Sequence, residues 1–231
     1  MAGKRGKGDG GIRILAVAAG AAPLLVLIAM FAAQFGIVDK TFAFDVLTMT
    51  IARYLALAGV AAAALAVVLA LQDVKRRGLF AAVAVVLAGA TLAMFLMQQA
   101  RFAAGAPTDV SSDLAEPPGF SRVIDSRRVE DKAGPVGQPQ VCATAVTLPT
   151  QVAPETASAA LKAAGFTVIG TAAFRAEGFH RGYWFGFTHD AVIRIRPGQT
   201  DVRVAAREGV TQGDEACRLA GAVVAALKTS S

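Results

Sequence analysis

The stretch AVIRIRPGQTDVRVAA, residues 191–206, decides the fold of the carboxyl-terminal half of the chain. Its two arms alternate aliphatic with charged residues, and alternate residues of a β-strand point to opposite faces of a sheet. The Pro-Gly dipeptide at 197–198 separates the arms, so the stretch predicts a β-hairpin with one aliphatic face and one face rich in arginine. The expected cross-strand pairs are Arg196 with Asp201, Ile195 with Val202, Arg194 with Arg203, and Ile193 with Val204.

Further short elements flank this hairpin. Runs of β-type residues alternate with turn-rich clusters, and two segments have helical start signals and apolar stripes. The predicted strands cover 141–147, 166–174, 183–188, 191–196 and 201–206, and the predicted helices cover 154–164 and a segment from Asp214 onward. This order predicts an α+β domain at 141–231, with two helices on one face of a small antiparallel sheet. Residues 101–140, rich in Pro and Gly, are expected to form a lead-in segment that is partly ordered at best.

The first hundred residues have the composition of a membrane domain. Hydrophobic residues make up 55% of the chain, charged residues 17%, and the mean hydropathy is +0.51. Transmembrane helices are expected at about 14–35, 51–71 and 79–97, which together predict a three-helix bundle at 1–100. Pro23 should kink the first helix, and a cleaved signal peptide is the competing interpretation of that segment. Small residues four positions apart would let the helices pack closely: Ala16 with Gly20, Gly59 with Ala63, and Gly89 with Ala93.

The basic residues are distributed unevenly around these spans. Four precede the first span and three lie in the second loop at 75–77, whereas the first loop has Lys40 between two aspartates. Because Lys and Arg are retained in the cytoplasm, the amino terminus is expected inside and residues 101–231 outside, in the periplasm of a bacterium. The protein is thus predicted to be a multi-pass protein of the inner membrane. Its net charge of +6 belongs mostly to the membrane flanks, which argues against a nucleic-acid partner.

Two stretches resemble a known family. The run PTDVSSD at 107–113, continuing to PPGF at 117–120, looks like the opening motif of membrane-anchored bacterial members of the domain of unknown function family 1499. The runs HDAVIRIRP at 189–197 and DVRVAAR at 201–207 are similar to that family's most recognisable stretch. The resemblance covers roughly 103–228. It implies a fold and a cellular location, but no catalytic residue. Val204 and residues 208–213 depart from the family's usual serine and Gly-Ser-Asp-Leu-Gly type turn.

The arginine-rich face of the hairpin is the candidate ligand or partner surface. Like charges facing each other across strands are unfavourable, so nearby acids, aromatic faces or an anionic ligand such as a lipid head group should compensate them. We hypothesise that the surface contacts membrane lipid or another envelope protein, with Trp184 on the opposite, aliphatic face. The surface consists of Arg194, Arg196, Arg203, Arg207, Tyr183 and Phe185.

Cys142 and Cys217 are the two cysteines of the chain. Both fall in the part expected outside the cytoplasm, where disulfides persist. A bond between them would join the first predicted strand to the last helix, and two buried thiols that never meet are the alternative.

An enzymatic role has three candidate residues, His180, His189 and Asp190. Ordinary turn residues are the simpler interpretation, because no zinc-ligand spacing, nucleophile elbow or phosphate loop accompanies them. We therefore expect no metal and no cofactor, and a non-catalytic domain for envelope interaction or lipid contact. A periplasmic hydrolase or metal-dependent enzyme, and an accessory subunit of a membrane complex, are the alternative functions.

Overall fold

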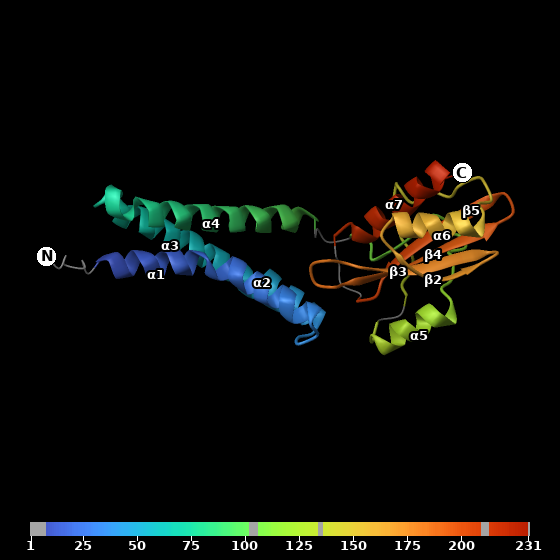
Figure 1. Ribbon diagram of the computed structural model, residues 1–231, viewed down its shortest axis with the longest axis horizontal. Helices are drawn as coiled ribbons and strands as arrows, with labels where there is room; N and C mark the ends of the chain where they lie inside the picture. The colour runs from blue at the N-terminus through green and yellow to red at the C-terminus, as the bar shows by residue number, and fades with distance from the viewer. Residues whose placement is uncertain (1–7, 102–105, 134–135, 209–212, 231) are drawn as a thin grey trace. The chain divides into compact units, whose positions relative to one another are not determined.

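The computed structural model describes residues 8–101, 106–133, 136–208 and 213–230 (Figure 1). The chain divides into two compact units, Met1–Ala100 and Arg101–Ser231. The first unit is helical and the second combines helices with an antiparallel sheet. The α+β class predicted for the chain is therefore confirmed.

The first apolar segment of the helical unit forms two helices, α1 (Gly8–Ala19) and α2 (Ala21–Gln34). They meet at Gly20 with a bend of 43°. The break lies one turn before Pro23, because a proline ring clashes with the carbonyl four residues earlier and cannot donate to it. The predicted kink is therefore present.

Two longer apolar helices follow. A π-helical segment, η1 (Phe42–Ala52), continues into α3 (Arg53–Ala70), and α4 (Val74–Arg101) comes next. The stretches Phe42–Ala70 and Val74–Gln98 are each long and apolar enough to cross a membrane, and the bent pair α1 and α2 would be a third span if it acts as one. Within the described residues, the helical unit thus has two or three candidate spans, which fits membrane association.

Small residues let the helices of this unit approach closely. A side chain added at Gly59 of α3 would meet the Ala19 backbone of α1 at 3.4 Å, whereas one added at Gly89 of α4 would meet nothing within 4 Å. The Gly59 position is therefore a contact point between helices, and the Gly89 position is not. The buried cluster of this unit contains Ile12, Ala19, Ala63, Ala66, Ala70, Ala81, Ala84 and Ala88.

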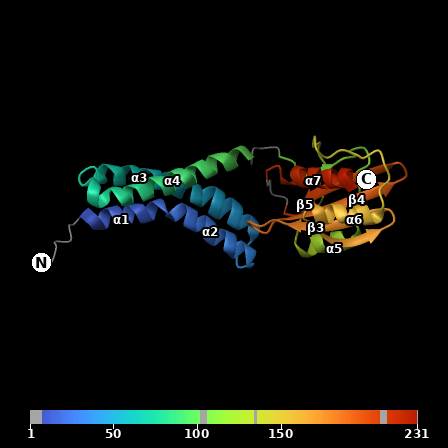
Figure 2. The ribbon, with the colours of Figure 1, turned by 45° about the horizontal axis from the view of Figure 1, so that its top comes forward.

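The second unit is built on a five-stranded antiparallel sheet with the strand order β1-β5-β4-β3-β2. Its strands are β1 (Asp109–Ser111), β2 (Thr167–Ala172), β3 (Arg175–Arg181), β4 (Thr188–Arg196) and β5 (Gln199–Ala206). Its helices are α5 (Arg122–Glu130), α6 (Pro154–Ala163) and α7 (Glu215–Ser230). Helices α6 and α7 lie side by side over one face of the sheet, and α5 lies on the other side (Figures 1 and 2).

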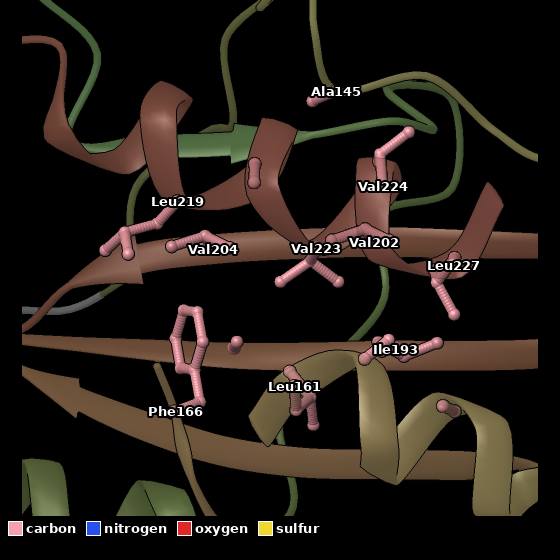
Figure 3. Close-up of a cluster of buried hydrophobic side chains, with 14 of the residues drawn as sticks. Ala145, Leu161, Phe166, Ile193, Val202, Val204, Leu219, Val223, Val224 and Leu227 are labelled. Atoms are coloured by element: carbon pink, nitrogen blue, oxygen red, sulfur yellow. The ribbon is translucent and has the colours of Figure 1, made fainter. Parts of the chain in front are cut away.

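The aliphatic core lies between the sheet and the two helices α6 and α7. Alternate residues of β4 and β5 point into it, and α7 contributes the apolar stripe that its sequence predicts (Figure 3). Helix α6 begins at Pro154 and is followed by Gly165 with φ +83°, as its start and stop signals predict. The buried members drawn from strands and helices include Ile193, Val202, Val204, Leu161, Leu219, Val223, Val224 and Leu227.

The predicted register of the β4–β5 hairpin is wrong by two residues. Arg196 pairs with Gln199, because the turn holds two residues only, and Gly198 adopts φ +72° there. Arg194 therefore lies opposite Asp201 and not opposite Arg203. A shift of two residues keeps every side chain on its predicted face, so the aliphatic and arginine-rich faces are both present.

Two predicted strands are absent. Residues 141–147 form no strand, since β1 already occupies the sheet edge beside β5 and the backbone turns back where Ala145 N donates to Cys142 O. Residues 183–188 mostly form the turn between β3 and β4.

Strand β3 is present but was not predicted, because Gly178 interrupts its pattern. A side chain at that position would lie 2.7 Å from the Thr167 carbonyl oxygen of β2.

The lead-in segment has more structure than its composition predicts. It supplies β1 at the edge of the sheet and α5. Its described prolines lie outside both elements, at 107, 117, 118 and 139.

Candidate functional site

The charged side chains of the sheet gather on the face opposite α6 and α7. Along β4, His189, Ile193 and Ile195 point toward the helices, so Asp190 and Arg194 point the other way. The lead-in segment covers that second face with ionic partners. We call these side chains the ionic layer: Arg128, Arg194, Arg196, Arg203, Arg207, Asp109, Asp113, Asp131, Asp190 and Asp201.

Asp190 is one of two carboxylates of the layer with a fully buried side chain, and Asp201 is the other. Arg207 of the chain after β5 donates to both of its oxygens, with Nη2–Oδ1 at 2.6 Å and Nε–Oδ2 at 3.0 Å. Arg128 of α5 donates to Oδ2 at 2.9 Å. Asp131 accepts a further bond from Arg207 at 2.6 Å. These bonds attach α5 to the centre of the sheet.

Arg203 of β5 pairs with Asp109 of β1 in the same two-pronged way. Its Nη2 and Nε donate to the two carboxylate oxygens at 2.7 and 3.0 Å. Its guanidinium also lies 5.3 Å from the ring centre of Phe120 and donates to the Pro118 carbonyl oxygen. The segment after β1 therefore covers Arg203, which is 8% exposed.

Arg194 and Arg196 share two carboxylates. Both donate to Asp113 Oδ2, at 3.1 and 2.8 Å, and both lie within 3.1 Å of Asp201 Oδ2. The pKa of Asp113 is lowered, first because the Glu116 backbone N–H donates to its carboxylate and then because of the two arginines. Carboxylates of the domain itself thus compensate these arginines, which is the first of the three predicted means of compensation.

The aromatic members of the predicted surface lie elsewhere, in the turn 182–187 between β3 and β4. Tyr183 is 82% exposed and Trp184 is 58% exposed, and their rings meet edge to face at 5.9 Å. Phe185 is buried, with its ring 6.0 Å from that of Phe187. Trp184 was expected on the aliphatic face; this is wrong, because its segment is a turn and does not alternate. Ligand binding by the arginines and aromatic residues stays a prediction.

The structure does not bring His180, His189 and Asp190 together. His189 and Asp190 are consecutive in β4 and point to opposite faces. His180 pairs with His189 across the strands, and its Nδ1 lies 2.8 Å from the Gly165 carbonyl oxygen. Burial lowers the pKa of His189 to about 4. Across the described ranges, no three His, Cys, Asp or Glu side chains form a group that could hold a metal ion.

A disulfide joins Cys142 to Cys217, with their Cα atoms 5.7 Å apart. It ties the loop before α6 to the first turns of α7. Thr144 of the same loop also donates to the Cys217 carbonyl oxygen at 3.3 Å. The loop is thus fixed over α7 by a covalent bond and a hydrogen bond.

The sequence analysis does not predict four of the ten residues of the ionic layer, Arg128, Asp109, Asp113 and Asp131. Asp109, Asp113 and Asp131 lie in the segment read as a lead-in, 70 or more residues before their arginine partners. The signal that could have found them is the aspartate pair at 109 and 113 of the opening motif, which matches the surplus of arginine on the hairpin. Pairing of such distant residues is set by the tertiary fold.

The fold and site define a class of protein: apolar helices followed by an α+β domain whose sheet has one aliphatic and one ionic face. A family model described as a protein of unknown function, DUF1499, matches residues 109–227. The chain belongs to this family, as its opening and hairpin motifs indicate. No curated protein and no solved structure matches the chain.

Proposed function

We propose that this protein holds its DUF1499 domain at the periplasmic surface of the inner membrane, where the domain contacts lipid without catalysing a reaction. The proposal has two parts, the side of the membrane and the surface used. The first rests on basic residues that flank the apolar helices, and the second on the turn 182–187.

The positive flanks support the orientation. Basic residues crowd the amino terminus and the connection between α3 and α4, at Lys75, Arg76 and Arg77. The connection between α2 and η1 has Lys40 beside Asp39. Retention of Lys and Arg in the cytoplasm would place the amino terminus inside, and three crossings would export the domain. The disulfide fits an oxidising compartment.

The exposed aromatic pair Tyr183–Trp184 is the observation that carries the lipid contact. Both rings lie on a short turn and are mostly solvent-exposed. Tyr and Trp favour the membrane interface, because the ring is apolar while its O–H or N–H is polar. Seven residues, 102–108, separate α4 from β1, a connection that spans at most about 25 Å. The ionic layer is neutralised by its own carboxylates, so the turn is the better lipid-contacting surface.

Trp184 is the only tryptophan of the chain, so its fluorescence tests the proposal directly. The full chain would be reconstituted into bilayers whose acyl chains carry bromine, which quenches tryptophan at contact distance. We expect strong quenching, and an emission maximum that is blue-shifted relative to that of tryptophan in water. A control variant, Trp184→Phe with Phe174→Trp, moves the tryptophan to the turn at the other end of β3, where Phe174 is 60% exposed. Equal quenching of both proteins, or quenching of neither, would refute lipid contact by this turn.

A further inference from the structure

A small basic pocket lies in the helical unit. It has a volume of about 140 Å³ and is lined by Ile12 and Arg13 of α1 and by Arg76, Arg77 and Phe80 of α4. The beginning of α4 lies beside α1 in both views (Figures 1 and 2). Three arginines and two apolar residues therefore line one cavity.

Neighbouring groups hold these side chains in place. The Arg13 guanidinium lies 5.5 Å from the ring centre of Phe80. Arg77 donates to the Leu69 carbonyl oxygen at 3.5 Å, near the end of α3. Asp73 accepts the backbone N–H of Arg76 and so caps the start of α4. The arginine side chains at 13 and 76 are exposed at the surface and that at 77 is half-buried.

The pocket stands at the polar end of two apolar helices. Arg13 directly precedes the apolar run at 14–35, and Arg77 lies two residues before the run that begins at Leu79. Beyond the arginines, the outer faces of both helices are apolar and exposed, with Ile14 at 69% and Leu79 at 75%. Such a surface suits acyl chains, whereas the guanidinium cluster suits a phosphate.

We infer that this pocket binds the phosphate of an anionic phospholipid, with the acyl chains along α1 and α4. A free phosphate ion would bind the arginines through charge alone and would gain nothing from the exposed apolar faces beside them. Basic pockets between transmembrane helices at the cytoplasmic side are suited to anionic head groups. The inference concerns the helices alone and does not depend on lipid contact by the turn 182–187.

Native mass spectrometry of the full chain tests this inference. Delipidated protein in neutral detergent would be titrated with phosphatidylglycerol, with phosphatidylcholine, and with inorganic phosphate alone. We expect saturable binding of one phosphatidylglycerol, and much weaker binding of the other two. The variant Arg13→Gln with Arg76→Gln should bind phosphatidylglycerol roughly thirtyfold more weakly, as the loss of two basic contacts implies. The control Arg53→Gln with Lys75→Gln removes the same charge from positions that do not line the pocket.

Each other outcome overturns the inference. Equal weakening in the control would show a diffuse effect of charge, and equal binding of the two lipids would show that the head group is not recognised. Inorganic phosphate that binds as tightly as the lipid and displaces it would identify a soluble anion as the ligand. If the double variant fails to fold, Arg76→Gln and Lys75→Gln form a second matched pair, and only the first should weaken binding.

Discussion

Asp190 of β4 and Arg207 lie together beneath α5 as a two-pronged ion pair, with Nη2–Oδ1 at 2.6 Å and Nε–Oδ2 at 3.0 Å. The carboxylate is fully buried and also accepts from Arg128. Two guanidiniums from distant parts of the chain thus depend on one carboxylate. The pair is central to the way in which the lead-in segment is held on the sheet.

Replacement of that carboxylate should destabilise the domain strongly. Asp190→Asn keeps the shape but removes the charge that both arginines share, and breaking a buried ion pair costs about 3–5 kcal/mol. Amide hydrogen exchange of β4 and β5 in the full chain measures the free energy of opening. Glu116→Gln is the matched control, because Glu116 pairs with Arg196 at 2.8 Å but its side chain is 72% exposed. A loss in the Asp190 variant no larger than in the control would contradict the assigned role.

His189 should make the domain less stable in acid. Its pKa is lowered from 6.5 to about 4 because it is buried, so the unfolded chain takes up a proton before the folded chain does. The stabilisation is complete above pH 6.5 and decreases as pH falls toward 4, by about 3 kcal/mol for this group. His189→Leu cannot titrate, so its urea midpoint, followed by circular dichroism, should fall less over that range. A variant with the same pH dependence as the natural protein would exclude His189 as the cause.

Gly178 is required by the close approach of β2 to β3. A methyl group there would lie 2.7 Å from the Thr167 carbonyl oxygen, which is backbone and cannot rotate away. Gly178→Ala should therefore destabilise the domain by about 1–3 kcal/mol, the usual cost of overpacking. Gly170→Ala in β2 is the control, since a side chain there meets nothing within 4 Å. Exchange rates of β3 amides would separate the two variants, and similar rates would show that the strands tolerate the added atom.

Reduction of the bond between Cys142 and Cys217 should loosen the loop before α6. Closing a loop over a sequence separation of 75 stabilises a fold by about 4 kcal/mol in the chain-entropy model. Alkylation of the denatured, unreduced protein should leave its mass unchanged, whereas prior reduction should add two alkyl groups. Full alkylation without reductant would show that the thiols are free. Cys142→Ser with Cys217→Ser should then match the reduced protein in stability.

Local patterns in the sequence predicted much of the sheet and two of the domain's helices. The alternation in 191–206 placed the aliphatic and arginine side chains on their correct faces, and Pro154 and Gly165 mark where α6 begins and ends. The register depended on the number of residues in the turn. The alternation of side chains between the two faces does not reveal this number, since a shift of two residues preserves both faces. Two-residue turns are the commonest in hairpins, and that preference favours the observed pairing.

The remaining errors have tertiary causes. Strand β3 contains Gly178, which is required by the close approach of β2, and the sequence of β3 alone does not show this contact. The turn 182–187 was predicted as a strand because aromatic residues are typical of strands. The ionic layer was predicted in part, because alternation groups the arginines of the hairpin. Three of their aspartates come from the Pro-rich segment, where Asp109 lies in β1, Asp113 follows β1 and Asp131 follows α5. Such partners have no shared local signal, and they become evident only when the fold brings them together.

The central claim is that the membrane helices export the DUF1499 domain, and a reporter at the carboxyl terminus tests it most directly. Alkaline phosphatase folds only in an oxidising compartment, and green fluorescent protein exported in unfolded form stays dark there. Fused after Ser231 of the full chain, the phosphatase should be active and the fluorescent protein dark. An inactive phosphatase fusion together with a fluorescent green fluorescent protein fusion would place the domain in the cytoplasm and contradict the account.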